Sequence, residues 1–208
     1  MTDIKVILLG NVGVGKSNLI NVYVGEKFNP NSLSNLTSSL FQKELTINNQ
    51  QYEISLWDTA GQERFRTITK SLINGLNVVL YVFSIIDETS FKDLNYWISC
   101  VEEKANNNYI SAIIGNKNDL YLIQKVKEEE ARKFAESKNI RFELCSAKDN
   151  AFGFSEFLNG LIKEYVNKYI FKEKRGRSTS IKLKQEKVIT NKQNKQAKTS
   201  GKNNCSCN

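Results

Sequence analysis

The glycine-rich run from Gly10 to Ser17 is the first segment whose spacing could do chemistry; it reads Gly-Asn-Val-Gly-Val-Gly-Lys-Ser. It follows an apolar run and precedes a helical pattern, which is the context that a phosphate-binding loop requires. Glycines let backbone N–H groups converge on an anion, and the helix N-terminus adds a favourable dipole. We expect Lys16 to reach the β- and γ-phosphates of a nucleotide and the Ser17 hydroxyl to ligate Mg²⁺. The predicted nucleotide-binding residues here are Asn11, Val12, Gly13, Val14, Gly15, Lys16, Ser17 and Asn18.

A second motif, Asn116-Lys117-Asn118-Asp119, directly follows the apolar run 109–114 and indicates which base is bound. The Asp119 carboxylate can accept hydrogen bonds from both N1–H and the 2-amino group of guanine. Adenine lacks that donor pair, so it would leave a buried carboxylate without partners. Asn116 and the stem of Lys117 would brace the base and the loop. The carboxyl end of a strand in a doubly wound sheet is a usual ligand site, which favours this interpretation.

Two further segments complete the predicted site. Ser146, Ala147 and Lys148 follow the last apolar run, and the Ala147 N–H would suit the guanine O6. Asp58-Thr59-Ala60-Gly61-Gln62 follows the run that ends at Trp57. There we expect Asp58 to hold Mg²⁺ through water, the Gly61 N–H to contact the γ-phosphate, and Gln62 to orient the attacking water. Gln62 and Lys16 are the predicted catalytic residues.

Alternating apolar and amphipathic stretches predict an α/β fold with helices on both faces of a mostly parallel sheet. Residues 45–56 alternate in polarity around Asn48-Asn49, which predicts a hairpin and hence one antiparallel edge strand. The expected strands are 4–9, 40–47, 52–57, 78–83, 109–114 and 140–144, and the expected helices are 16–25, 90–104, 127–137 and 154–169.

The 208-residue chain carries a net charge of +8, but this charge is concentrated at one end. Residues 1–171 hold 19 basic and 20 acidic side chains, whereas residues 172–208 hold 11 basic and 2 acidic ones. We therefore predict a folded domain over 1–171 and a disordered basic tail over 172–208.

A nearly neutral domain argues against specific nucleic-acid binding. The apolar runs are too short for a membrane span, and no signal peptide is expected. The absence of His excludes a His base or ligand.

Taken together, the order and spacing of these four motifs over about residues 3–169 resemble the Ras superfamily of small GTPases. Arg64-Phe65-Arg66-Thr67-Ile68-Thr69, Trp97 and the basic tail ending in two cysteines are similar to the Rab subfamily. The resemblance implies a three-layer fold with a six-stranded sheet, one antiparallel strand and five helices. It implies binding of Mg²⁺ and GTP or GDP, with Phe28 packed edge-on against the guanine.

The same resemblance implies a membrane-attached switch in vesicle traffic that hydrolyses GTP slowly without a GTPase-activating protein. Its partners would be an exchange factor, a GTPase-activating protein, effectors and escort or dissociation-inhibitor proteins. We expect a monomer on the cytoplasmic face of an endomembrane that cycles through the cytosol.

Two positions depart from the family pattern. Asn35 stands where the family places its Mg²⁺-ligating switch threonine, and Thr37 follows two positions later, so either residue could take that role. Val12 places a β-branched side chain beside the γ-phosphate, where it could crowd Gln62. The alternative hypothesis is therefore a hydrolysis-impaired scaffold that holds nucleotide constantly and binds effectors.

Cys205 and Cys207 lie close to the end of the basic tail. The favoured interpretation, as in Rabs, is geranylgeranylation of both. The ending Cys-Ser-Cys-Asn also fits a C-a-a-X box, which would lipidate Cys205 alone. Two chains, or one chain with a polybasic stretch, hold a protein stably at a membrane.

Overall fold

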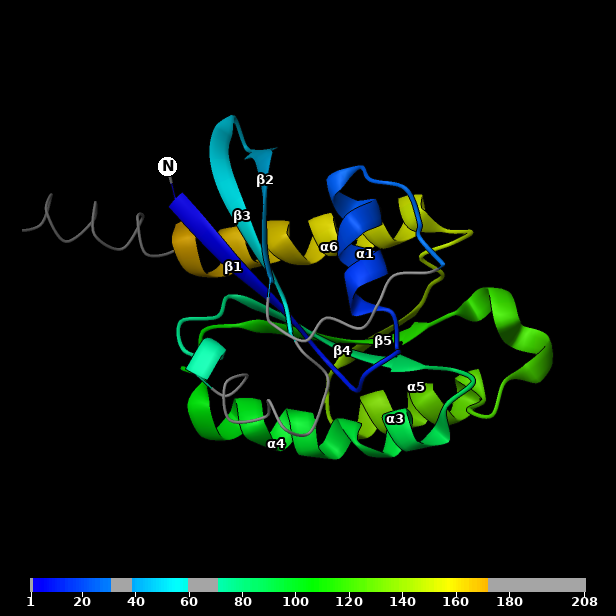
Figure 1. The fold of residues 1–208 in the computed structure, drawn as a ribbon. Coiled ribbons are helices and arrows are strands. Elements are labelled where there is room, and N and C mark those ends of the chain that lie inside the picture. The colour runs from blue at the N-terminus through cyan, green and yellow to red at the C-terminus, as the bar shows by residue number, and fades with distance from the viewer. Residues whose placement is uncertain (1, 31–38, 60–70, 172–208) are drawn as a thin grey trace, which may run out of the picture. The chain divides into compact units, whose positions relative to one another are not determined.

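In the part of the chain that the structure describes, six strands form one mixed sheet in the order β2-β3-β1-β4-β5-β6 (Figure 1). The structure is a computed structural model and describes residues 2–30, 39–59 and 71–171. β2 and β3 pair antiparallel, and every other neighbouring pair is parallel, which confirms the predicted antiparallel edge strand. The strands are β1 (Thr2–Leu9), β2 (Ser39–Ile47), β3 (Gln50–Asp58), β4 (Val78–Ser84), β5 (Ile110–Asn116) and β6 (Arg141–Leu144).

Helices cover both faces of the sheet, as the alternating pattern predicts. Figure 1 shows α1 and α6 on one face and α3, α4 and α5 on the other. The described part of the chain holds five α-helices: α1 (Lys16–Val24), α3 (Glu88–Lys92), α4 (Leu94–Lys104), α5 (Glu128–Ser137) and α6 (Ala151–Tyr165). A 3₁₀ segment, η2 (Asn118–Ile123), and a π-helical segment, η3 (Val166–Phe171), complete the described elements. The three-layer α/β fold is therefore confirmed.

The central strands are apolar because they are covered on both faces. All seven residues of β4 are buried, and this uninterrupted burial is typical of a parallel strand between two helical layers. The edge strand β2 instead alternates exposed and partly buried residues over most of its length. These burial patterns explain why β4 is a continuous apolar run in the sequence, whereas polar and apolar residues alternate in β2.

The hairpin between β2 and β3 depends on two asparagines with left-handed backbone. Ile47 pairs with Gln50, so Asn48 and Asn49 alone form the loop. Their φ angles are 49° and 59°. A two-residue loop with positive φ at both positions matches the right-handed twist of the strands, and asparagine tolerates this conformation better than most residues.

Aromatic side chains anchor both helical layers. On the α3–α5 face, Phe83 of β4 packs against Phe91 of α3 with ring centroids 5.0 Å apart, and Trp97 of α4 is 1% exposed. On the other face, Tyr23 of α1 meets Phe154 of α6 edge-on at 6.4 Å. The Tyr23 hydroxyl donates to Asn159 Oδ1 at 2.8 Å, so this buried phenol also joins α1 to α6.

The helix predicted over 90–104 is two helices, α3 and α4, separated by Asp93. α3 begins earlier than predicted because the Asp87 carboxylate caps it, accepting hydrogen bonds from the N–H groups of Thr89 and Ser90. Such a cap satisfies backbone donors that the first helical turn leaves without partners.

The chain divides into two units, Met1–Tyr165 and Val166–Asn208. The predicted boundary after residue 171 stays a prediction. Among the described residues, no helix combines the length and apolar character that crossing a membrane would require.

Gly115 of β5 and Gly160 of α6 allow a matched test of packing. A Cβ on Gly115 would lie 2.6 Å from Leu144 Cδ2 and 3.0 Å from Phe83 Cζ, whereas a Cβ on Gly160 meets nothing within 4 Å. Gly115→Ala should lower the free energy of unfolding by about 1–3 kcal/mol through overpacking. Gly160→Ala should raise it by about 0.5–1 kcal/mol, because alanine is the better helix former. Urea denaturation of both variants checks this, and equal effects would contradict the packing at Gly115.

Candidate nucleotide-binding site

The glycine-rich loop joins β1 to α1 and leaves no room for side chains at two of its glycines. A Cβ on Gly10 would lie 2.1 Å from the Val82 carbonyl oxygen, and one on Gly15 would lie 2.3 Å from Asn116 Nδ2. Gly15 also has a φ of 99° as the residue that caps α1. Glycine is therefore needed here both for close approach and for backbone conformation.

Lys16, the first residue of α1, is held inside this loop. Its Nζ donates to the carbonyl oxygens of Gly10 and Asn11, both at 2.9 Å, and the residue is only 5% exposed. Burial lowers the pKa of Lys16 to about 8, although the nearby Asp58 carboxylate acts in the opposite direction. The loop thus positions a lysine ammonium at the amino end of a helix, where an anion is favoured.

Ser17 and Asp58 bring two side-chain oxygens together from elements far apart in the sequence. Ser17 Oγ lies 2.6 Å from Asp58 Oδ2, and Asp58, at the end of β3, is fully buried. Within residues 2–30, 39–59 and 71–171, no group of three or more His, Cys, Asp or Glu side chains is placed to hold a metal ion. A hydroxyl and a carboxylate do fit Mg²⁺, which usually combines one or two protein oxygens with water and substrate phosphates.

Asn116, the last residue of β5, connects the glycine-rich loop to the loop after β6. Its Nδ2 donates to the Val14 carbonyl at 2.8 Å, and its Oδ1 accepts from the Ala147 N–H at 3.3 Å. The side chain is 1% exposed. The buried amide of Asn116 therefore joins its own motif, 116–119, to the glycine-rich loop and to the loop that carries Ala147.

The Asp119 carboxylate is oriented by Ser146. Ser146 Oγ donates to Asp119 Oδ1 at 2.7 Å and accepts from the N–H groups of Lys148 and Asp149 at 3.2 and 3.0 Å. Lys117 takes a left-handed φ of 67° to turn the chain between Asn116 and Asp119. Asp119 Oδ2 has no hydrogen-bond partner among the described residues, which leaves an acceptor available to a ligand.

Asn18 has a different contact from the one expected of a nucleotide-binding side chain. Its amide donates to the Asn29 carbonyl at 3.0 Å and accepts from the Asn29 N–H at 3.1 Å. This pairing braces the segment after α1 that carries the half-buried Phe28. Val12 is 43% exposed on the glycine-rich loop.

Three hydrogen bonds that hold the loops in place have no signal in the local sequence. Asn11 Nδ2 donates to Asp93 Oδ2 at 2.8 Å, and Asn11 Oδ1 accepts from Trp97 Nε1 at 3.3 Å. Thr59 Oγ1 donates to the Leu8 carbonyl at 2.6 Å. These partners are more than 50 residues apart in sequence, and no local pattern indicates such a pair.

Several predicted residues lie outside the described part of the chain: Gly61, Gln62, Asn35, Thr37, Cys205 and Cys207. Their roles stay predictions.

Comparison with known proteins identifies similar sequences. The family model described as "Ras family" matches residues 5–167. "GTP-binding protein ypt3" of Schizosaccharomyces pombe is 36% identical over 145 residues, covering 70% of this chain and 68% of that protein. "Ras-related protein Rab-11B" of Dictyostelium discoideum is 37% identical over 146 residues, covering 70% of this chain and 66% of that protein. "Ras-related protein SEC4" of Saccharomyces cerevisiae is 34% identical over 188 residues, covering 90% of this chain and 78% of that protein.

The Asn116 bridge can be tested by a pair of Asn→Asp changes two residues apart. Asn116→Asp replaces the donor to Val14 with a second acceptor, so GDP affinity should fall by about 10- to 100-fold. Asn118→Asp changes an exposed side chain in the same motif and should leave the affinity within about twofold. Displacement of fluorescent GDP measures both. A similar loss in the two variants would mean that charge alone, rather than the bridge, weakens binding.

The lowered pKa of Lys16 predicts proton uptake when GDP binds to protein freed of nucleotide. At pH 8 about half of the Lys16 side chains would be neutral, and phosphate charge should restore full protonation. Calorimetry in buffers of different ionisation enthalpy should therefore detect about half a proton taken up at pH 8 and about a tenth at pH 7. No uptake at pH 8 would show that Lys16 is already fully charged.

Proposed function

Because the chain belongs to the Ras family and is a small GTPase of the Rab type, we propose that it acts as a membrane-attached switch in vesicle traffic. In this proposal it binds GDP and GTP with Mg²⁺, hydrolyses GTP slowly by itself, and recruits effectors in one nucleotide state. The observation that carries the proposal is the single buried amide of Asn116, which joins the predicted phosphate loop to the predicted base loop. A bound nucleotide would contact both loops at once.

Base selection would rest on Asp119. Ser146 holds one carboxylate oxygen in place, so the carboxylate is oriented before the base arrives. Its acceptors match the N1–H and 2-amino donors of guanine. The Ala147 N–H, beside Asn116, would serve O6, and Lys117, Lys148 and Phe28 would pack around the base. The contacts seen for Asn116 and Ser146 support these assignments because they fix the positions of the loops that would carry them.

Phosphate binding would rest on the loop 10–17 and on Lys16. The backbone of Asn11, Val12, Gly13, Val14 and Gly15 would surround the β-phosphate, and the Lys16 ammonium would exchange carbonyl partners for phosphate oxygens. The N–H groups of Ser17 and Asn18 open α1 and would serve the α- and β-phosphates. Ser17 and Asp58 would hold Mg²⁺, which neutralises phosphate charge as hydrolysis proceeds.

For hydrolysis, we propose that Gln62 orients the attacking water, that the Gly61 N–H contacts the γ-phosphate and that Lys16 stabilises the charge that develops on it. Such catalysis is slow without a partner, on the order of 10⁻⁴ s⁻¹ in Ras itself. Val12 would slow it further, because a β-branched side chain on this exposed part of the loop would crowd Gln62 or a partner's arginine beside the γ-phosphate. Asn35 or Thr37 would complete the Mg²⁺ shell in the GTP-bound form.

Membrane attachment would come from the tail. One or both of Cys205 and Cys207 would carry a geranylgeranyl group, and the basic excess in residues 172–208 would attract an anionic cytoplasmic leaflet. Exchange factors, a GTPase-activating protein, effectors and escort or dissociation-inhibitor proteins would control the cycle of a monomeric protein between an endomembrane and the cytosol.

The proposal is tested by the nucleotide that co-purifies with the chain and by single-turnover hydrolysis. Wild-type protein should carry GDP, and Val12→Gly should raise the hydrolysis rate about tenfold if the valine crowds the γ-phosphate. Val14→Ala, a change of similar size in the buried part of the loop, should not raise the rate. Bound GTP in the wild type, with no hydrolysis in either protein, would favour the scaffold alternative. An unchanged rate in Val12→Gly would contradict the role of Val12.

A further inference from the structure

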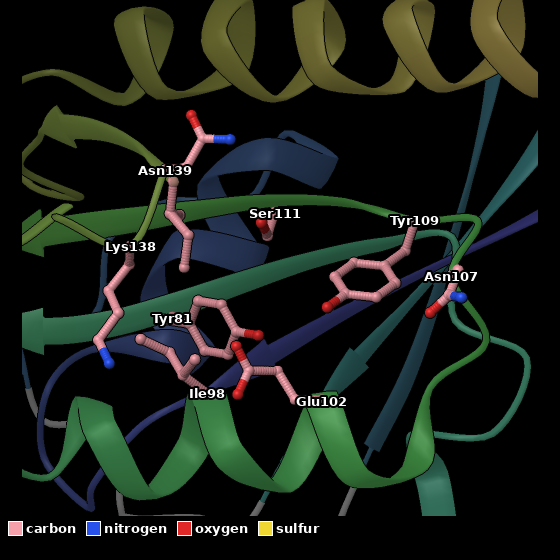
Figure 2. A pocket seen from close by; sticks show the side chains of 9 residues that line it. Tyr81, Ile98, Glu102, Asn107, Tyr109, Ser111, Lys138 and Asn139 are labelled. Carbon is pink, nitrogen blue, oxygen red and sulfur yellow. The ribbon is translucent and has the colours of Figure 1, made fainter. Parts of the chain in front are cut away.

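A pocket of about 280 Å³ lies between α4 and the neighbouring strands of the sheet (Figure 2). It is lined by residues of β4, α4 and the start of β5, and by the turn between α5 and β6. The nucleotide loops follow the carboxyl ends of β1, β5 and β6, whereas this pocket lies where β5 and β6 begin. Its volume lies just below the usual range of about 300–1,000 Å³ for binding sites, so it suits a ligand of only a few heavy atoms.

Tyr81, in the middle of β4, is the buried polar group of this pocket. Its side chain is 1% exposed, and its hydroxyl forms no hydrogen bond with any residue in the described ranges. Figure 2 shows the hydroxyl directed toward the same part of the pocket as the Glu102 carboxylate and the Tyr109 ring. Burial raises the pKa of Tyr81, so the phenol stays neutral and its oxygen remains available as an acceptor.

The electrostatic surroundings of this hydroxyl are negative. Besides burial, neighbouring groups raise the pKa of Tyr81, and among them the Glu102 carboxylate is the one that is charged at neutral pH. Glu102, on α4, forms no ion pair with a described residue, and in particular none with Lys138 at the α5 end of the pocket. Among the described residues that line the pocket, this carboxylate is thus the one charged acceptor.

We propose that this pocket binds a small organic monocation, an alkylammonium or alkylguanidinium compound, whose charged group lies between the Glu102 carboxylate and the Tyr81 hydroxyl. The cation supplies N–H donors to both oxygens, and a hydrogen bond to a carboxylate is among the stronger ones. The two tyrosine rings provide a surface that tolerates a cation. Lys138 disfavours a second positive charge, so a monocation fits better than a diamine.

The probe is ethylguanidinium, with propionate as an anion of similar size and putrescine as a dication. Each is titrated into the full chain loaded with GDP, and binding is followed by NMR shifts of the backbone amides of Ser111 and Asn139. Ethylguanidinium should bind saturably and more tightly than propionate or putrescine. GDP should stay bound throughout, because the two sites are separate.

Glu102→Gln should weaken ethylguanidinium binding by up to about fivefold, since it removes the charge of this exposed residue but keeps its shape. Tyr81→Phe, which removes only the hydroxyl, should weaken it by a smaller factor. The matched control is Glu103→Gln, whose carboxylate instead faces Lys104 at 3.4 Å; it should leave the affinity unchanged.

Three results would overturn the proposal: no saturable binding of ethylguanidinium, equal binding of propionate, or full affinity in Glu102→Gln. Nucleotide content, measured on every variant, confirms that each protein is folded.

Discussion

The proposed site depends on the two hydrogen bonds that the side chain of Asn116 forms. Its amide donates to the Val14 carbonyl and accepts from the Ala147 N–H, so one buried group joins three loops from distant parts of the chain. The contact also explains Gly15, because any side chain there would occupy the place of the Asn116 amide. A buried amide that leaves either group without a partner is costly, so the loops are held in register by the cost of separating them.

Local pattern was enough to predict most of the fold. The continuous burial of β4 and the alternation in β2 follow from whether helices cover one or both faces of a strand, and both leave a direct trace in the sequence. The hairpin at Asn48-Asn49 also leaves a trace in the sequence, because positive φ at two successive residues restricts the residue types that fit. The early start of α3 is not predicted, because Asp87 acts as a cap only once the chain has turned. The division at Asp93 is not predicted either, because Asp93 itself keeps right-handed helical dihedral angles.

The site was predicted as a set of motifs but not as a network. Spacing predicts that Asn116, Asp119 and Ser146 belong to one site, because the carboxyl ends of parallel strands share one edge of a sheet. It does not predict that Ser146 orients Asp119, nor that Asn11 reaches Asp93 and Trp97. The residues in these contacts lie far apart in the sequence, and no periodic pattern links one partner to the other. The pocket at Tyr81 is unpredictable for the same reason, since its lining comes from four separate segments.

The strand β5 runs from the pocket to the loops of the proposed nucleotide site. It begins beside the pocket that Ser111 and Tyr109 line, and it ends at Asn116 in the loop network. Its seven residues span about 20 Å, and they are hydrogen-bonded to β4 along their whole length. The strand is also buried from Ala112 to Asn116, so close packing on both faces leaves it little room to bend locally. The pocket and the proposed nucleotide site therefore share one buried strand, the pocket at its amino end and the nucleotide site at its carboxyl end.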